Sequence, residues 1–161
     1  MERDAAGEGV RLVNPRFYGR DEKGQAYVIS AKEAVRDPKQ GNEVSLTAPE
    51  VSLNSEGELT TKVRSDTGTY RESDKTLRLH GKVRLEDGRG YRFDTEEALV
   101  DTETNVVRGG KPLQGVGPAG AISADSYTIY DQGARTRFSG RVRARIERGG
   151  GSVAPAQGEA R

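Results

Sequence analysis

Apolar and polar residues alternate with a period of two along much of this chain, and β-strands are the structure that this period builds. The stretch LRLHGKVRL (77–85) has its apolar residues and a glycine on one parity, and His80 with the basic residues on the other. TRFSGRVRARI (136–146) repeats the pattern. In VSLTAPEVSL (44–53), the parity shifts at Pro49, which indicates a bulge or a sheet edge. We therefore expect half-buried strands at all three places.

A second pattern recurs at a spacing of about 30 residues, which is typical of a stacked repeat. It begins in YVISAKEAV (27–35), and three later stretches align with it. The alignment gives one apolar column and, two residues later, one column of small residues: Ile29, Val63, Phe93 and Ile122, then Ala31, Ser65, Thr95 and Ala124. The sequence thus predicts about four strand–turn–strand units, each of which buries its apolar face on its neighbours.

Composition favours an all-β fold and excludes some classes of protein. The chain has 21 Gly and no Trp. Residues that favour hairpin turns are concentrated in the segments RDEKGQ, NSEGE, ESDK, EDGRG, DTETN and YDQGAR. Lys and Arg number 26 and Asp and Glu 25, which leaves a net charge of +1. This balance argues against nucleic acid as a partner, because phosphate binding requires an excess of positive charge. With no cysteine, the chain has no disulfide framework.

The sequence predicts one domain over residues 10–147, between a disordered start (1–9) and a disordered tail (148–161). The tail is rich in Gly, Ala and Pro and has no apolar face to bury, as in a linker. No stretch is long and apolar enough to cross a bilayer, and residues 1–9 lack the apolar centre of a signal peptide. We expect either a cytosolic protein or one whose targeting or anchoring segment has been removed.

Three features invite a catalytic or ligand-binding interpretation, and each is better explained structurally. His80 is the only histidine and lies on the polar parity among basic residues, so we expect a solvated side chain. Glu96 and Glu97 are strand neighbours that point to opposite faces, so they cannot flank one glycosidic bond. RGGKPLQGVGPAG (108–120) lacks the ending of a phosphate-binding loop and is predicted as a flexible connection between strands. We expect no catalytic residue, no metal and no cofactor.

The long apolar face is the remaining candidate for function. Two sheets that do not close leave an elongated slot that suits an acyl chain, and a closed sandwich core is the equally supported alternative. The expected lining of the slot is Ile29, Leu46, Val63, Leu79, Leu85, Phe93, Ile122, Phe138 and Val142. The arginines of the last strand form either a solvated face or a basic rim for an anionic ligand or acidic partner.

Several segments together resemble the LptC family, the membrane-anchored periplasmic component of the bacterial lipopolysaccharide transporter. They are NPRFYGRDEKGQAYVISAKEAVRDP (14–38), VSLTAPEVSL, KVRSDTGTYRESDKTLRLHGKVRL (62–85), YRFDTEEALVD (91–101) and FSGRVRARI (138–146). The resemblance covers nearly all of residues 12–147, and the NPRF start is its most specific part. It implies an open, twisted antiparallel β-jellyroll whose interior holds the acyl chains of lipopolysaccharide.

The resemblance also implies partners and a location. An inner-membrane ABC transporter would contact the N-terminal edge, at Asn14, Phe17, Tyr18 and Tyr27. The periplasmic bridge protein LptA would contact the C-terminal edge, at Arg137, Arg141, Arg143 and Arg145. Family members are tethered to the inner membrane by an N-terminal helix, which this chain lacks. The alternatives are the soluble bridge protein itself, a secreted carbohydrate-processing enzyme and a structural β-repeat adhesin.

Overall fold

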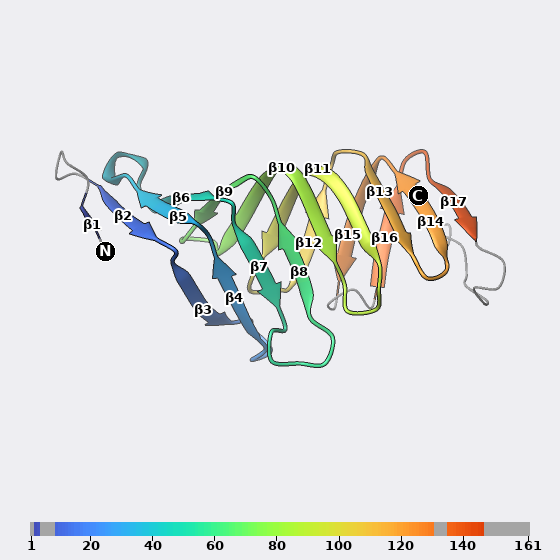
Figure 1. The fold of residues 1–161 in the computed structure, drawn as a ribbon, viewed down its shortest axis with the longest axis horizontal. Coiled ribbons are helices and arrows are strands. Elements are labelled where there is room, and N and C mark those ends of the chain that lie inside the picture. Colours follow the sequence, from blue (N-terminus) through green and yellow to red (C-terminus); the bar gives the residue numbers. More distant parts are fainter. Residues whose placement is uncertain (1, 4–8, 131–134, 147–161) are drawn as a thin grey trace.

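The protein is built from antiparallel β-strands. The computed structural model describes residues 2–3, 9–130 and 135–146. Within these residues the chain forms strands and one short 3-10 helix, Pro38–Gln40. Figure 1 shows the strands stacked along the long axis of the molecule, from β2 and β3 at one end to β17 at the other. The prediction of an all-β, open antiparallel jellyroll is confirmed.

The strands form two layers that share one long hairpin. The first layer contains β1 (Glu2–Arg3), β2 (Val10–Val13), β5 (Glu33–Arg36), β6 (Glu43–Thr47), β9 (Thr67–Arg71), β12 (Val106–Gly109), β15 (Ser126–Tyr130) and β16 (Arg135–Ser139). The second contains β3 (Arg16–Arg20), β4 (Ala26–Ser30), β7 (Glu50–Leu53), β8 (Thr61–Arg64), β13 (Leu113–Gly117), β14 (Gly120–Ala124) and β17 (Arg143–Ile146). The shared hairpin is β10 (Thr76–Glu86) and β11 (Arg92–Asp101), which pairs with strands of both layers.

Each pass of the chain crosses from one layer to the other, and the line of crossings is called the crest below. In β10 the crossing lies at Gly81 and Lys82, where φ is +85° and +47° and the register with β11 shifts. Glycine adopts such a left-handed backbone without steric cost, and a bulge there bends the strand. Asn14 and Ala48 take positive φ at the crossings between β2 and β3 and between β6 and β7. The parity shift predicted at Pro49 is therefore a crossing of the crest.

The small residues of the repeat lie at the crest. Ser65 separates β8 from the crossing into β9, and its Oγ donates to the Thr67 carbonyl at 2.8 Å. Thr95 lies within β11, and its Oγ1 donates to the Pro112 carbonyl at 2.9 Å. A small side chain leaves room where the two layers converge, and a hydroxyl satisfies a carbonyl that the bend has removed from the strand ladder. Each copy of the repeat found in the sequence therefore marks a place where the chain crosses from the second layer to the first.

Two expectations about strands are wrong. Residues 136–146 form no single strand, because the chain crosses the crest between Ser139 and Arg143 and continues as β17 in the other layer. RGGKPLQGVGPAG is no flexible connection, because it contains β13, which pairs with β11 and β14. Aromatic rings lie where side chains of its glycines would be: a Cβ on Gly115 would lie 2.4 Å from Phe93, and one on Gly117 1.9 Å from Tyr91. The rings supply the packing that glycine lacks in a strand.

The predicted boundaries and turns are partly covered by the described residues. Glu2–Arg3, within the segment expected to be disordered, pair with β2 as strand β1. Residues 4–8 and the predicted tail 148–161 lie outside the described residues. The predicted turn segments that begin at Arg20, Asn54, Glu72, Glu86 and Asp101 all join adjacent strands. The last one, YDQGAR, falls largely on residues that the structure does not describe.

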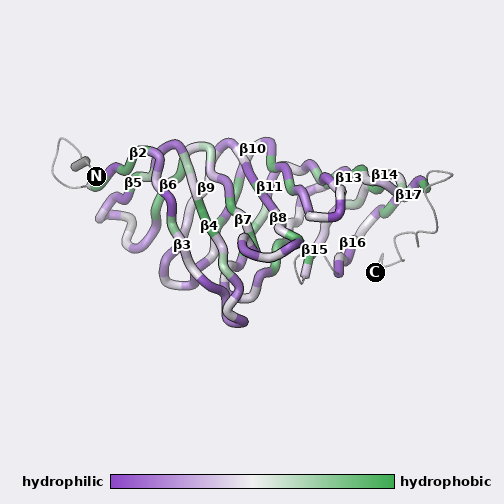
Figure 2. Tube along the Cα trace, turned by 60° about the horizontal axis from the view of Figure 1, so that its bottom comes forward, coloured by the Kyte–Doolittle hydropathy of each residue, from purple (hydrophilic) through white to green (hydrophobic). Residues whose placement is uncertain are grey.

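The apolar core lies between the two layers. Figure 2 shows hydrophobic and hydrophilic residues alternating along the strands. Replacing Leu79, which is 0% exposed in the centre of this core, with Ala is expected to lower the free energy of unfolding by about 2–5 kcal/mol, because it leaves a cavity. Urea unfolding measures the loss. The control, Val13→Ala at a site 60% exposed, is expected to cost less than about 0.5 kcal/mol, and equal losses would contradict the packing described here.

Candidate functional site

One row of inward-facing residues crosses the entire second layer. The residues are neighbours in strand register, from the N-terminal edge to the C-terminal edge: Phe17, Ile29, Val51, Val63, Leu85, Phe93, Gly115, Ile122 and Ala144. All are apolar, and those between the two edge strands are buried or partly buried. The row is a continuous apolar track as long as the layer itself.

The first layer faces this track with a similar row. Its register neighbours are Leu12, Ala34, Leu46, Gly68, Leu79 and Ala98, and Tyr127 and Phe138 pair nearer the C-terminal end. All residues predicted to line a slot face this interior: Ile122 and Val142 are partly buried and pack on the core, and the others are buried in it. The predicted lining left out core residues on other strands, among them Val100 and Val107. Their alternating apolar positions were the available signal.

Aromatic rings join the two layers near the C-terminal end. Phe93 of the second layer and Phe138 of the first have ring centroids 6.0 Å apart at an interplanar angle of 44°. Tyr91 stacks beside Phe93 at 6.5 Å. Beyond them the interior becomes more accessible, since Ala144 is exposed and Ile146 is 44% exposed. The apolar interior is therefore tightly filled at its centre and opens toward β17.

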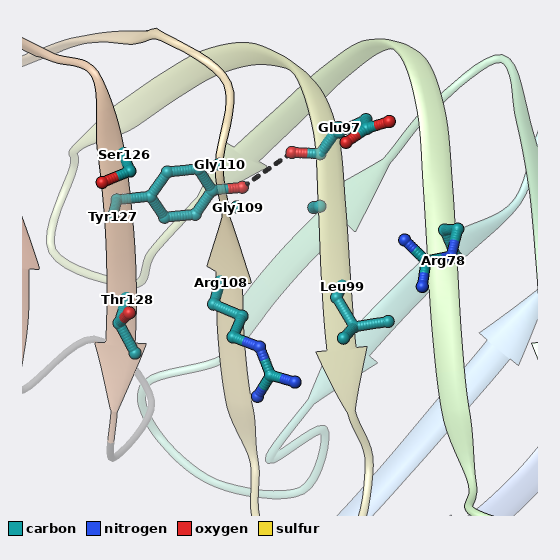
Figure 3. Close-up of a pocket in the computed structure, with 10 residues that line it drawn as sticks. Arg78, Glu97, Leu99, Arg108, Gly109, Gly110, Ser126, Tyr127 and Thr128 are labelled. Atoms are coloured by element: carbon teal, nitrogen blue, oxygen red, sulfur yellow. Dashed lines mark hydrogen bonds between the residues drawn. The ribbon is translucent and has the colours of Figure 1, made fainter.

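Tyr127 is a buried polar residue that sequence reasoning missed. Figure 3 shows its ring pointing across Gly109 toward Glu97, whose main-chain carbonyl accepts a 3.0 Å hydrogen bond from the Tyr127 hydroxyl. A Cβ on Gly109 would lie 2.6 Å from this ring, so the glycine makes the contact possible. A hollow of about 360 Å³ adjoins the contact and is bordered by Arg78 and Arg108. The hydrogen bond ties three strands of the first layer together.

Burial of two tyrosines predicts a loss of stability at high pH. Burial, and then the neighbouring Tyr27, raises the pKa of Tyr70 to about 12, and burial raises the pKa of Tyr127 further above its ordinary value. The folded state therefore favours the neutral phenols. Their contribution is complete below pH 10 and is lost as the pH rises through 10 toward 12. Urea unfolding across this range should show the fall, and Tyr127→Phe should make it shallower; an unchanged slope would contradict the assignment.

The predicted N-terminal contact residues are placed differently from one another. Phe17 and Tyr18 lie on β3, and the pairing described for this strand is with β4. Tyr18 is 72% exposed and Phe17 36%. Asn14 lies at the crest, where its backbone N–H donates to the Lys32 carbonyl at 2.8 Å. Tyr27 lies on β4 instead, partly buried, with its ring over Gly19. Phe17 and Tyr18 are thus the side chains that an edge partner would meet first.

The predicted C-terminal arginines do not form one column, because the crest separates them. Arg137 lies on β16 in the first layer, whereas Arg143 and Arg145 lie on β17 in the second. Arg141 lies at the crossing, and its guanidinium Nε is 3.2 Å from Asp125 Oδ2. Hydrogen bonds from the Arg141 side chain and backbone lower the pKa of Asp125. Arg141 therefore fixes the crossing, and the exposed charge at this edge is divided between the layers.

The residues considered for catalysis lie on the surface. His80 Nδ1 is 3.5 Å from Glu97 Oε2, its cross-strand neighbour on β11. Both side chains are partly exposed. Among the described residues, no group of three or more His, Cys, Asp or Glu could hold a metal ion. Within the same residues, no helix is both long and apolar enough to cross a membrane.

The structure is an open β-jellyroll. It has two antiparallel layers with an apolar track between them, and among the described residues each end strand pairs with one neighbouring strand. The model of the family of LptC-related lipopolysaccharide-assembly proteins matches residues 11–147, and the chain belongs to this family. It is a periplasmic family of lipopolysaccharide transport and outer-membrane biogenesis, and its members are transport components. No curated protein matches the sequence of the chain.

Proposed function

We propose that this protein accepts lipopolysaccharide from an inner-membrane ABC transporter into the apolar interior between its two layers, called the groove below, and passes it to the periplasmic bridge protein LptA. The observation that carries the proposal is the apolar row across the second layer, which links Phe17 at one edge to Ala144 at the other. A track of this kind gives an acyl chain an apolar environment over the whole distance between two partners. Transfer along it requires no catalytic group.

The groove would take acyl chains by parting its layers. The inner side chains fill the space between the layers at the centre, and because these side chains are apolar their contacts are non-directional. Acyl chains can replace such contacts with equivalent ones at little cost. Near the C-terminal end, Phe93 and Phe138 would have to move aside, since their rings lie between the layers.

The edges suit strand-by-strand docking. At the N-terminal end β3 pairs with β4, and at the C-terminal end β16 and β17 pair with β15 and β14 respectively. An edge strand presents backbone donors and acceptors that a partner strand can bind. We place the transporter at β3, beside Phe17 and Tyr18, and the bridge protein at β17, beside Arg143 and Arg145. We also propose that a helix preceding the domain tethers it to the inner membrane.

A photocrosslinking amino acid at Leu79 tests the proposed function. Leu79 faces the groove at the centre of the first layer, so its probe should crosslink lipopolysaccharide when the transporter is supplied with ATP. The matched control places the probe at Arg78, the next residue, which faces outward. Crosslinking at position 79 but not at 78 is the expected result. Equal crosslinking at both positions, or none at either, would contradict transport through the groove.

Among the described residues, the end strands β3 and β17 each pair with one neighbour, and this arrangement also fits the soluble bridge protein as a second candidate function. A bridge protein would join copies of itself end to end, β17 of one against β3 of the next. Light scattering over a range of concentrations separates the two. Growth of the particle mass with concentration would favour the bridge, whereas a constant mass is expected for the component that we propose.

A further inference from the structure

Two turns from opposite layers touch each other at the N-terminal half of the groove. One is the β3–β4 turn (21–25) of the second layer, and the other is the β11–β12 turn (102–105) of the first. The Glu22 N–H donates to the Glu103 carbonyl at 2.9 Å. Asn105 Nδ2 donates to Asp21 Oδ2 at 3.3 Å. The crest joins the layers along one side, so a contact between turns at the far ends of the strands closes the other side.

The β3–β4 turn is shaped to make this contact. Asp21 Oδ1 accepts hydrogen bonds from the backbone N–H groups of Lys23 at 2.9 Å and Gln25 at 2.8 Å. This fixes the turn and leaves Oδ2 directed at Asn105. Asp21 is only 8% exposed, which is unusual for a carboxylate in a hairpin turn. Gln25 Oε1 lies 3.4 Å from the same Asn105 amide nitrogen.

The β11–β12 turn is held equally firmly on its own layer. Asp101 Oδ1 accepts hydrogen bonds from the backbone N–H groups of Glu103 and Thr104, at 3.0 and 3.1 Å. Thr102 is 0% exposed and donates from its hydroxyl to the Lys75 carbonyl at 2.9 Å. Asn105 adopts φ +63°, a conformation that asparagine tolerates better than most residues. Hydrogen bonds therefore hold each turn in one conformation before the two turns come into contact.

The contact is also incomplete in a way that favours release. Asn105 Oδ1 is buried and has no hydrogen-bond partner among the described residues. A buried acceptor without a partner destabilises the closed state, since water would satisfy it in an open one. Asp21, Glu22 and Glu103 place like charges on the two sides, and Lys75, whose Nζ is 3.7 Å from Glu103 Oε2, offsets part of this repulsion. Few bonds hold the turns together, and opening them breaks no strand pairing.

We propose that this contact, between Asp21, Glu22, Glu103 and Asn105, is a latch that closes the side of the groove and must open for acyl chains to enter its N-terminal half. The inference rests on the proposed function, because it assigns a gate to the same groove. With the latch closed, the side of the groove beside the N-terminal half is shut. With the latch open, the layers can part along the side that faces the N-terminal partner.

The chain has no cysteine, so a disulfide can lock the latch without side reactions. The backbone hydrogen bond between residues 22 and 103 places these two positions next to each other, and a disulfide joins Cα atoms that are about 4.4–6.8 Å apart. We would combine Glu22→Cys and Glu103→Cys with a photocrosslinking probe at Leu79 or at Phe138. Oxidation should lower lipopolysaccharide crosslinking at position 79 at least fivefold, and reduction should restore it. Each single cysteine variant serves as a control that oxidation leaves unchanged.

The two probe positions separate failure of the latch from failure of the proposed function. Crosslinking at 79 that oxidation does not change, in a chain shown by gel mobility to carry the disulfide, would overturn the latch alone. No crosslinking at either position in the reduced chain would overturn the transport function itself. Asn105→Asp gives an independent readout, since a second carboxylate beside Asp21 should open the latch. Hydrogen exchange of residues 21–25 should then accelerate at least fivefold, and unchanged exchange would contradict the latch.

Discussion

A chain in which Phe93 is replaced by Glu should lose most of its crosslinking to lipopolysaccharide from a probe at Leu79, by about tenfold or more. Phe93 is 7% exposed, lies in the apolar row of the second layer and faces Phe138 across the groove. A carboxylate there must stay hydrated, so it excludes acyl chains from the track; a tenfold loss corresponds to about 1.4 kcal/mol, a modest cost for desolvating a charge.

The control for this prediction adds the same charge to the opposite face. Gln114 pairs with Asp94, next to Phe93, but points outward and is exposed, so Gln114→Glu should crosslink normally. Circular dichroism shows whether each variant has kept its strands. Phe93→Ser replaces the Glu variant if the latter does not fold, and Phe138→Glu tests the facing layer. Normal crosslinking in folded Phe93 and Phe138 variants would rule out the groove as the lipid path.

Replacing Gly120 with Ala is expected to detach β17 and weaken binding of the bridge protein at least tenfold. Gly120 has φ +144°, and a Cβ there would lie 1.9 Å from the Arg145 carbonyl oxygen. No side-chain rotation relieves a clash with backbone, so the pairing of β14 with β17 must give way. The structure describes this one pairing for β17, so its loss removes the proposed docking strand. A tenfold loss of affinity corresponds to about 1.4 kcal/mol of binding free energy.

Two measurements follow this variant. Hydrogen exchange should become fast at residues 143–146 and stay slow in β10 and β11, and titration with purified bridge protein gives the affinity. Gly110→Ala is the matched control, because a Cβ at Gly110 meets nothing within 4 Å. It should preserve both protection and affinity. If the Gly120 variant exposes β17 to exchange and still binds with normal affinity, the bridge protein docks elsewhere.

The sequence predicted the strands, the turns and the inward residues well because each depends on neighbours in the chain. Alternation placed Leu79 and Leu85 in the interior, and the repeat columns placed Phe93 there. The repeat columns marked recurring positions, but small side chains at Ser65 and Thr95 did not reveal that the chain changes layers there. The inward parity shifts at these crossings, from Val63 to Gly68 and from Phe93 to Ala98, but a shift of parity indicates a bulge or a sheet edge as readily as a change of layer.

Features that depend on distant contacts could not be predicted. The division of the arginines between layers follows from the crossing near Arg141, where Asp125 binds its guanidinium. The partial burial of Tyr27 follows from its place on the second strand of the layer, which a local turn signal cannot give. The contact of Asp21 with Asn105 joins two ordinary hairpin turns from opposite layers, and neither turn carries a signal for the other.

The shared hairpin has a consequence for how the protein folds. β10 and β11 pair from Thr76 opposite Asp101 to Glu86 opposite Arg92, so this hairpin alone of the described passes builds a section of both layers from one local contact. Local contacts form first, and a stacked array then grows from neighbour to neighbour. Folding should begin at this hairpin and proceed outward in both directions. β3 and β17 would then order last and loosen first. The two strands that the rest of the chain stabilises least are thus the two whose unpaired backbone groups a strand of another protein can bind.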